Sequence, residues 1–433
     1  MDKVECIVVG GGLAGLATAY GLADAGLEVM VLERGDYSGA KNVTGGRLYV
    51  QPLQGIYPEL WSEAPFERPV ARELISLVGD GDSTTIEVAS NRFVERPHSY
   101  TVIRAKLDQW LAQRVSEKGA MVLPKMKVDS LLCEPSEDRP RVTGIRAGDD
   151  EIAADVVVVA EGVLGLLASG AGLRPKPEPG HLAVGYKETL ELPPDVIEDR
   201  WRLNPGDGAA HLFVGAVTGG IPGGGFIYTN RESISLGLVV GMAHLRAPSS
   251  TTQAPELLTR FKELPQVRPM VAGGNLVEYS AHAICEGGIA QVPQLQGDGY
   301  VLVGDAAGLS LNALFTVRGM DLAIASGYHA AQAVIEAKRA HDFTAAGLGS
   351  YERRLRQSFV LRDLKTYRSV PKLMQNQRLY ARYPPAIANF LAELYTVGPE
   401  PAERISPRIS RAVRRSLLSV SVLRDAMSLR KAS

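Results

Sequence analysis

A short stretch near the amino terminus constrains the fold more than any other part of the chain. The segment VECIVVGGGLAGLATAYGLADAGLEVMVLERG (4–35) predicts a buried strand, a glycine turn, an alanine-rich helix and a second strand. Gly10, Gly12 and Gly15 form G-x-G-x-x-G at the turn. The first permits a tight turn, the second lets a pyrophosphate approach the backbone, and the third allows close helix–strand packing. The segment therefore predicts a dinucleotide whose phosphates meet the helix N-terminus, with an unliganded glycine turn as the alternative.

An acidic residue at the end of the second strand narrows the choice of dinucleotide. Glu33 lies where a carboxylate accepts hydrogen bonds from ribose hydroxyls. Its charge disfavours a 2′-phosphate, which leaves NAD or FAD.

The segment GYVLVGDAAG (299–308) bears on that choice. It predicts another buried strand with Asp305 at its carboxyl end, where the carboxylate can bind a ribityl hydroxyl or a water on the pyrophosphate. A long helix then begins near Arg318 and Gly319. Its positive end favours the negative charge of a reduced flavin. The pattern predicts one FAD, bound non-covalently; the alternative is an ordinary strand–helix turn with a capping aspartate.

The remaining sequence predicts an α/β fold in three parts. Residues 181–290 contain short alternating runs broken by Gly and Pro, which are typical of an antiparallel sheet, and the chain from about 346 is helical with Pro breaks. We expect a discontinuous Rossmann-like FAD-binding domain at 1–75, 98–175 and 296–345. An antiparallel-sheet substrate domain would comprise 76–97 and 176–295. A helical C-terminal region, 346–433, would face a partner or a membrane.

Composition excludes several classes of protein. The three cysteines, Cys6, Cys133 and Cys285, are far apart and too few for a thiolate-held cluster, so no metal or iron–sulfur site is expected. We expect no signal peptide and no bilayer-spanning run. The net charge is −1, which indicates no particular partner, and no nucleic acid is expected. From Tyr351 to Ser433, however, 17 Lys/Arg face six Asp/Glu, so this basic region needs its own explanation.

Several motifs together resemble a known family. The glycine motif, the R..LD..L helix at Arg104–Leu111 and GDAAG are similar to FAD enzymes of the aromatic-hydroxylase/glutathione-reductase type. SGAKNVTGGRLY (38–49), AVGYKETLELP (183–193), AHAICEGGIAQVPQL (281–295) and GLSLNALFTVRGMDLAIASG (308–327) more narrowly resemble the FixC family, relatives of electron-transfer-flavoprotein (ETF):quinone oxidoreductase.

The resemblance implies which residues hold the cofactor. Gly10, Gly12, Gly15, Glu33, Arg104 and Asp305 would hold the ADP and pyrophosphate half, and Val128 would contact adenine. Lys41, Asn42, Thr44, Gly45, Arg318, Gly319 and Met320 would lie against the isoalloxazine. Leu13, Ala14, Arg34, Glu161, Gly162 and Gly304 complete the predicted set. The alternatives are a plain Gly-rich loop for 41–47 and a surface helix-start arginine for Arg104.

Two departures from related families shape the functional prediction. Aromatic hydroxylases carry D-G-x-x-S-x-x-R, whereas EGVLGLLA (161–168) has Gly165 and Ala168 where Ser and Arg would be, which disfavours direct reduction by NAD(P)H. The quinone oxidoreductase is known for a C-terminal [4Fe–4S] cluster, but no cysteine here lies beyond residue 285. In the FixC arrangement the cluster lies on a small ferredoxin-like subunit (FixX), and ETF-like alpha and beta subunits (FixA and FixB) complete the complex. The resemblance thus implies a subunit that receives electrons from its partners. It would reduce a membrane quinone within an electron-bifurcating, NADH-oxidising complex.

The substrate side is less defined by the sequence. Tyr228, Tyr279, His282 and Phe315 are the candidate quinone-facing residues. His282 is the one candidate proton donor, with a structural role as its alternative, and no other acid or base is assigned.

Quinones lie in membranes, so we expect a peripheral protein on the cytoplasmic side. Ile409, Val413, Leu417, Val420, Leu423 and Met427 form one helical stripe, with Arg408, Arg411, Arg414 and Arg415 largely elsewhere. This stripe, like the apolar segment 384–399, either contacts the membrane or packs on protein. Two other functions stay open: a geranylgeranyl-reductase-like FAD enzyme acting on isoprenoid lipids, and an assembly scaffold with a structural flavin.

Overall fold

The computed structural model describes residues 2–41, 46–135, 139–245, 253–399, 401, 404–416, 425 and 427. The chain forms two compact units, each with its own hydrophobic core. The first comprises Met1–Glu67, His98–Leu182 and His282–Arg368, and the second comprises Arg68–Pro97, Ala183–Ala281 and Ser369–Ser433. The C-terminal residues are thus divided between the units. The three-part division expected from the sequence stays a prediction.

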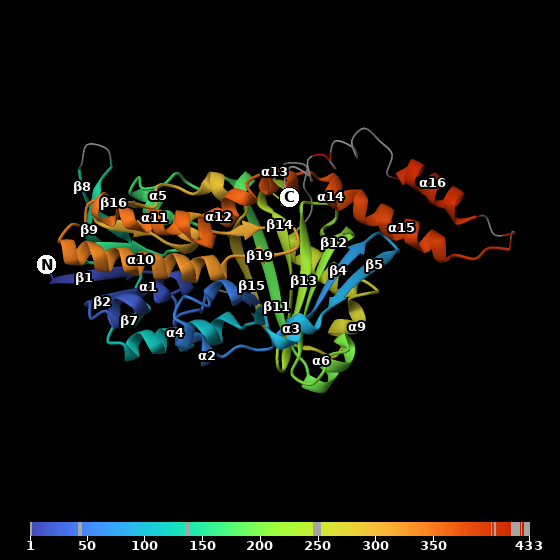
Figure 1. Cartoon of the computed structure of the whole chain (residues 1–433), viewed down its shortest axis with the longest axis horizontal. Helices are drawn as coiled ribbons and strands as arrows, with labels where there is room; N and C mark the ends of the chain where they lie inside the picture. Colours follow the sequence, from blue (N-terminus) through green and yellow to red (C-terminus); the bar gives the residue numbers. More distant parts are fainter. Residues whose placement is uncertain are drawn as a thin grey trace. The chain divides into compact units, whose positions relative to one another are not determined.

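The first unit is built on an eight-stranded sheet (Figure 1). Its main path runs β16 (Gln296–Gly297), β17 (Tyr300–Leu302), β10 (Asp150–Val159), β1 (Asp2–Val9), β2 (Val29–Glu33) and β7 (Met121–Pro124), and β8 (Ser130–Glu134) and β9 (Arg141–Ala147) pair beyond β10. β17, β10, β1, β2 and β7 are parallel. Continuous apolar runs such as the valines of β10 suit strands that are covered on both faces.

Helices and two small two-stranded sheets complete the first unit. Its helices are α1 (Leu13–Asp24), α2 (Pro58–Ser62), α4 (Arg104–Glu117), α5 (Leu166–Gly170), α10 (Met320–Ala340), α11 (Ser350–Gln357) and α12 (Phe359–Thr366). One small sheet pairs β3 (Arg47–Tyr49) with β6 (Ser99–Thr101), and the other is the hairpin of β18 (Leu311–Asn312) and β19 (Val317–Arg318). α1 packs against both α4 and α10 (Figure 1).

The second unit is built on a seven-stranded sheet. Its order is β15 (Asn275–Cys285), β11 (Leu182–Glu191), β14 (Ser233–Gly241), β13 (Gly223–Thr229), β12 (Gly208–Gly215), β4 (Val70–Val78) and β5 (Ser83–Ala89). Residues 282–285 of β15 belong to the first unit. The sheet is mixed rather than purely antiparallel, because β4 pairs with β12 in parallel. Short-range alternation in the sequence does not reveal this pairing, since the two strands are far apart in the chain.

Short helices accompany this second sheet. They are α3 (Asn91–Glu95), α6 (Pro194–Trp201), α7 (Met242–Leu245), α8 (Ala254–Glu263), α9 (Arg268–Val271), α13 (Val370–Met374), α14 (Arg378–Ala381), α15 (Tyr383–Tyr395) and α16 (Ile405–Ser416). α15 packs on β4, β5 and β12 with Pro384 and Ala388 buried. The first part of the apolar segment 384–399 therefore packs on protein along this face, whereas Tyr395 and Val397 are exposed. Of the predicted amphipathic stripe, Leu417, Val420 and Leu423 lie outside the described residues, as do the side chains of Arg408, Val413, Arg414 and Arg415.

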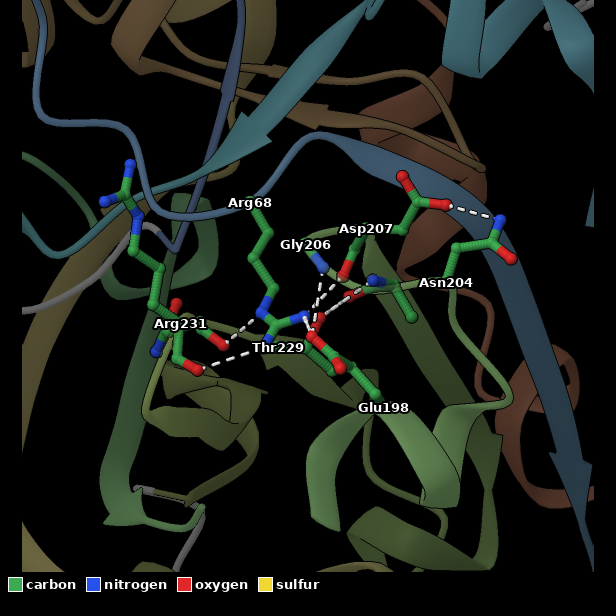
Figure 2. Close-up of polar contacts among 9 residues, drawn as sticks. Arg68, Glu198, Asn204, Gly206, Asp207, Thr229 and Arg231 are labelled. Atoms are coloured by element: carbon green, nitrogen blue, oxygen red, sulfur yellow. Dashed lines mark hydrogen bonds and ion pairs between the residues drawn. The ribbon is translucent and has the colours of Figure 1, made fainter. Parts of the chain in front are cut away.

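A buried arginine, Arg68, connects several segments of the second unit (Figure 2). The Arg68 side chain is 3% exposed, and its Nε donates to the carbonyl of Asn230 at 2.7 Å. One terminal nitrogen donates to Glu198 Oε1 and to the carbonyl of Asp207, both at 2.8 Å, and the other donates to the carbonyl of Arg231 at 3.0 Å. Arg68 therefore ties the chain before β4 to α6 and to two turns.

Candidate functional site

The parallel sheet of the first unit brings several predicted residues to one edge. Strand register aligns Val9 with Leu32 and with Val159, and Val159 with Leu302. The residues that follow these strand ends include Gly10, Glu33, Glu161 and Asp305. In open α/β sheets, ligands bind outside the carboxyl ends of the strands, next to the point where the strand order reverses. Here that point is β1, which has β2 on one side and β10 on the other.

The turn after β1 leads directly into a helix start without a side-chain cap. Gly10 has φ +110°, and a Cβ there would approach Ala160 O to 2.3 Å, so no other residue fits without displacing the backbone. α1 begins at Leu13, after Gly12, and no side chain caps it. Its first amides therefore keep hydrogen-bonding capacity for an anion.

The Glu33 carboxylate is held in place beside this turn. Oε2 accepts from the Gly11 amide at 2.9 Å, and Oε1 accepts from the Gly35 amide at 2.6 Å. Each oxygen keeps a further lone pair. Glu33 is thus oriented at the end of β2 with capacity for a hydroxyl donor.

A second uncapped helix start lies in the same unit. α10 begins at Met320 after Gly319, which has no side chain to cap it, and Asp321 of its first turn lies close to its own amide and to that of Leu322. Apart from its chain neighbours, no atom of the described residues would lie within 4 Å of a Cβ on Gly319, so these residues leave the space beside it open. α1 and α10 pack closely because Gly327 lies against Ala14, where a Cβ would reach Ala14 O at 2.3 Å.

The Arg104 guanidinium is positioned by a partner on its own helix. Nε and a terminal nitrogen donate to the two carboxylate oxygens of Asp108, both at 2.8 Å, and the Asp108 side chain is fully buried. Asp305 lies nearby, and burial raises the pKa of its carboxyl while Arg104 and Arg174 oppose that change. Within the described chain the Asp305 carboxylate accepts no hydrogen bond, so it retains capacity for a ligand.

The Arg318 side chain is already used by the protein. Its guanidinium donates to Asp321 Oδ2 from two nitrogens, at 2.8 and 2.5 Å, and to Asp363 Oδ2 at 2.6 Å. It also lies 5.3 Å from the centre of the Phe359 ring. The part of Arg318 that is available to a ligand at the start of α10 is therefore its backbone.

These features surround one cavity of about 450 Å³, a size typical of small-molecule sites. Of the predicted cofactor residues, the lining contains Gly10, Gly12, Leu13, Ala14, Glu33, Arg34, Lys41, Arg104, Val128, Glu161, Gly162, Asp305, Arg318, Gly319 and Met320. Gly15 and Gly304 are not among the lining residues and serve close packing, since a Cβ at either would lie within 3 Å of another atom. Asn42, Thr44 and Gly45 lie outside the described residues.

Glu161, at the cavity wall, caps the start of α5. Its carboxylate accepts from the amides of Leu167 at 2.8 Å and Ala168 at 2.7 Å, at the start of α5. Burial raises the pKa of Glu161, and these amides oppose the change. The divergent 161–168 segment therefore forms a capped helical turn.

Of the four quinone-facing candidates, His282 is the one among the described lining residues. Burial, together with Arg104 and Arg34, lowers the pKa of His282, so the ring is neutral at pH 7. Tyr228 and Tyr279 belong to the second unit, where Tyr228 stacks on Phe226 with ring centres 5.0 Å apart. Phe315 is 69% exposed on the loop between β18 and β19.

Sequence reasoning did not single out several residues of this site. Asp108 was recognisable, because an Arg–Asp pair four apart on a helix faces one way. Arg47 lines the cavity and is held by Ser99 at 2.9 Å. Glu286 and Asn312 also line the cavity, and they are connected across 26 residues. No local pattern predicts that last contact.

The residues present fit an FAD. Two uncapped helix starts, a ribose-type acid at Glu33, an unpaired carboxylate at Asp305 and open space at Gly319 match the parts of such a ligand. The bound cofactor would supply two-electron storage; the chain supplies oriented amides, carboxylates and cations.

Comparisons with known proteins agree with this reading. The sequence model of the FAD dependent oxidoreductase family matches residues 5–80. A probable electron transfer flavoprotein-quinone oxidoreductase, YdiS, of Escherichia coli K12 is 45% identical over 409 residues, 94% of each chain. Protein FixC of Salmonella typhimurium is 42% identical, covering 92% of this chain and 91% of FixC.

A solved structure confirms the predicted fold class. The crystal structure of a geranylgeranyl bacteriochlorophyll reductase-like protein from Thermoplasma acidophilum has a TM-score of 0.73 over the whole of both chains. At 18% identity this likeness concerns the fold alone.

Proposed function

The chain belongs to the family of FixC proteins and ETF–quinone oxidoreductases and is an FAD-dependent oxidoreductase, and on this premise we propose that it passes electrons from ETF-type partners to a membrane quinone. The observation that carries the proposal is 45% identity, over 94% of both chains, with a probable ETF–quinone oxidoreductase. The cavity residues described above would hold the FAD between the starts of α1 and α10.

The proposed electron donors are ETF-like alpha and beta subunits of the FixA and FixB type and a small FixX-type subunit with a [4Fe–4S] cluster. The names of the FixC relatives support such an assembly. Among the described residues, no three His, Cys, Asp or Glu side chains gather as a metal site. We propose that any cluster belongs to the partner and that the complex oxidises NADH and bifurcates its electrons.

The proposed site of action is the membrane surface on the cytoplasmic side. No helix in the described part of the chain is long and apolar enough to cross a bilayer. The excess of positive charge after Tyr351 suits an anionic surface, each basic group near it contributing about 1 kcal/mol. Co-sedimentation with anionic but not neutral vesicles tests this part.

The experiment that tests the function separates electron entry from electron exit. The flavin-loaded chain is mixed with NADH alone, with NADH plus ETF-type subunits, and with a short-chain quinone added to each. We expect flavin bleaching and quinone reduction when the ETF-type subunits are present. Rapid bleaching by NADH without them contradicts the proposal.

An isoprenoid reductase remains the second function to be compared in that assay. Its support is the fold likeness to a geranylgeranyl reductase-like protein, which at 18% identity does not extend to substrate. Oxidation of the reduced protein by a prenyl diphosphate, with none by quinone, would favour it.

A further inference from the structure

The cavity wall contains five carboxyl groups whose environments differ: Glu33, Asp129, Glu161, Glu286 and Asp305. Glu33 and Glu161 each accept hydrogen bonds from two backbone amides. Asp129 pairs with Lys127 at 2.7 Å and accepts from the Gly148 amide at 2.9 Å. All three carboxyl groups therefore have hydrogen-bond donors or a cation within the protein.

Asp305 has cations rather than amide donors. Burial raises the pKa of its carboxyl, and the guanidinium groups of Arg104 and Arg174 oppose that change. Four of the five carboxyl groups thus have either amide donors or cations to hold a negative charge.

Glu286 has neither. Its carboxylate accepts one long hydrogen bond, from Asn312 Nδ2 at 3.4 Å, and within the described ranges it forms no ion pair. Its backbone amide donates to the carbonyl of His181 at 2.8 Å, which fixes its place at the end of β15. Burial with so little compensation raises the pKa of Glu286.

The charged and titratable neighbours do not change this picture. Besides the other four carboxyl groups, the charged and titratable groups of the cavity wall are His282 and Cys285 on β15, Arg34 after β2, Lys41, Arg47 on β3, Arg104 on α4, Lys127 and Arg318 on β19, with Arg174 after α5 close to Asp305. Arg104 is bound to Asp108 and Arg318 to two aspartates, and Arg174 donates to the Ala306 carbonyl at 2.6 Å. His282 is neutral, and the remaining neighbour of like charge is Asp305.

Contacts also place Glu286 near one end of the cavity. Its partner Asn312 pairs with Val317 across the β18–β19 hairpin, and Leu311 pairs with Arg318. Arg318 is followed by Gly319 and the start of α10, the end at which the isoalloxazine is proposed to lie. The phosphate-binding turn at Gly10 belongs to the other helix, α1.

We propose that the carboxylic acid of Glu286 donates one of the two protons taken up when a quinone is reduced beside the flavin; the step rests on the function proposed above. The O–H bond of Glu286 breaks, and its proton passes to a carbonyl oxygen of the quinone. Two electrons come from the electron donor by way of the cofactor, and the second proton comes from water. The remaining carboxylate then takes a proton from solvent.

The first test measures electron exit alone. The flavin-loaded chain is reduced with dithionite, and its reoxidation by a short-chain quinone is followed by flavin absorbance. Glu286→Gln should slow reoxidation roughly 100-fold, the usual contribution of a general acid. Glu286→Asp should retain most of the rate, and Glu352→Gln, a surface control on α11 paired with Arg356, should retain all of it. The wild-type rate should fall as pH rises.

The second test is independent of turnover. A carboxyl group with a raised pKa in the folded state stabilises the protein below its unfolded pKa and loses that contribution as pH rises. The melting temperature of Glu286→Gln should therefore exceed that of wild type by a margin that grows as pH rises above about 4.3, the pKa of an unperturbed glutamate. A pH-independent margin overturns the inference, because it means that Glu286 is ionised throughout.

The outcomes distinguish the two proposals. If quinone oxidises neither wild type nor variant, the proposed function fails and the proton step fails with it. If quinone oxidises Glu286→Gln as fast as wild type, the function stands and the role of Glu286 is refuted.

Discussion

Replacing Arg68 tests whether this side chain supports the backbone or acts chiefly as half of an ion pair. Its hydrogen-bond acceptors include three backbone carbonyls, those of Asn230, Asp207 and Arg231, and the carboxylate of Glu198 (Figure 2). Arg68→Met removes these four hydrogen bonds from a side chain that is 3% exposed.

The expected cost follows from these contacts. Hydrogen bonds from a charged group contribute about 1.5–3 kcal/mol each, but water that enters the turns recovers part of this for the carbonyls. Glu198 is 19% exposed and regains water, so the lost hydrogen bonds determine the cost, and Arg68→Met should lower the free energy of unfolding by about 4 kcal/mol. Arg68→Lys keeps the charge but loses the planar fork, and should cost about 2 kcal/mol.

Denaturant unfolding followed by tryptophan fluorescence provides the assay, in a Trp61→Phe, Trp110→Phe background that leaves Trp201 as the one tryptophan. Trp201 ends α6, the helix that carries Glu198, and it is 3% exposed. Arg260→Met is the matched control, because that side chain is 71% exposed with a 3.9 Å contact to Glu256, and it should leave stability nearly unchanged. A loss below about 1 kcal/mol for Arg68→Met would refute the reasoning. A loss for Glu198→Gln equal to that for Arg68→Met would show that the ion pair dominates.

Three further predictions concern the cavity and a buried histidine. Gly319→Leu should leave the fold intact but fill the open space before α10, weakening flavin binding by about tenfold or more, measured by titration of the apoprotein. Asp108→Asn removes the anion that orients Arg104, so flavin should dissociate faster, as measured by fluorescence release; unchanged retention contradicts the positioning role. Burial lowers the pKa of His211 to about 3, so its contribution to stability is lost as pH falls from about 6.5 towards 3. His211→Phe should reduce this acid-induced loss of stability, measured as the free energy of unfolding against pH. An unchanged pH dependence would contradict the prediction.

Much of the fold and of the candidate site was predictable because the signals are local. The glycine turn, the acid ending β2 and the aspartate after β17 each follow a buried strand, and parallel strands deliver their carboxyl ends to one edge. The comparisons with known proteins confirm the family resemblance and the FAD-dependent oxidoreductase class. The assignment of individual cofactor residues stays a prediction.

What the sequence did not reveal depends on distant contacts. The Arg318 side chain is held partly by Asp363, 45 residues away, so its use by the protein has no local signature. Glu286 meets Asn312 through the path of β15 and a hairpin. The apolar face of α15 was equally consistent with lipid or protein, and its burial on β4, β5 and β12 depends on tertiary packing.

The close packing of α1 on α10 has a consequence for ligand length. Gly21 and Gly327 let the two helices approach until neither has room for one more carbon, so their amino ends cannot slide independently. The distance between the amino ends of α1 and α10 is therefore fixed. On the proposed placement, with the pyrophosphate at one end and the ring system at the other, this distance corresponds to the ribityl chain, which FAD and FMN share. Preference for FAD over FMN would then depend on contacts with the adenylate half, beyond the start of α1.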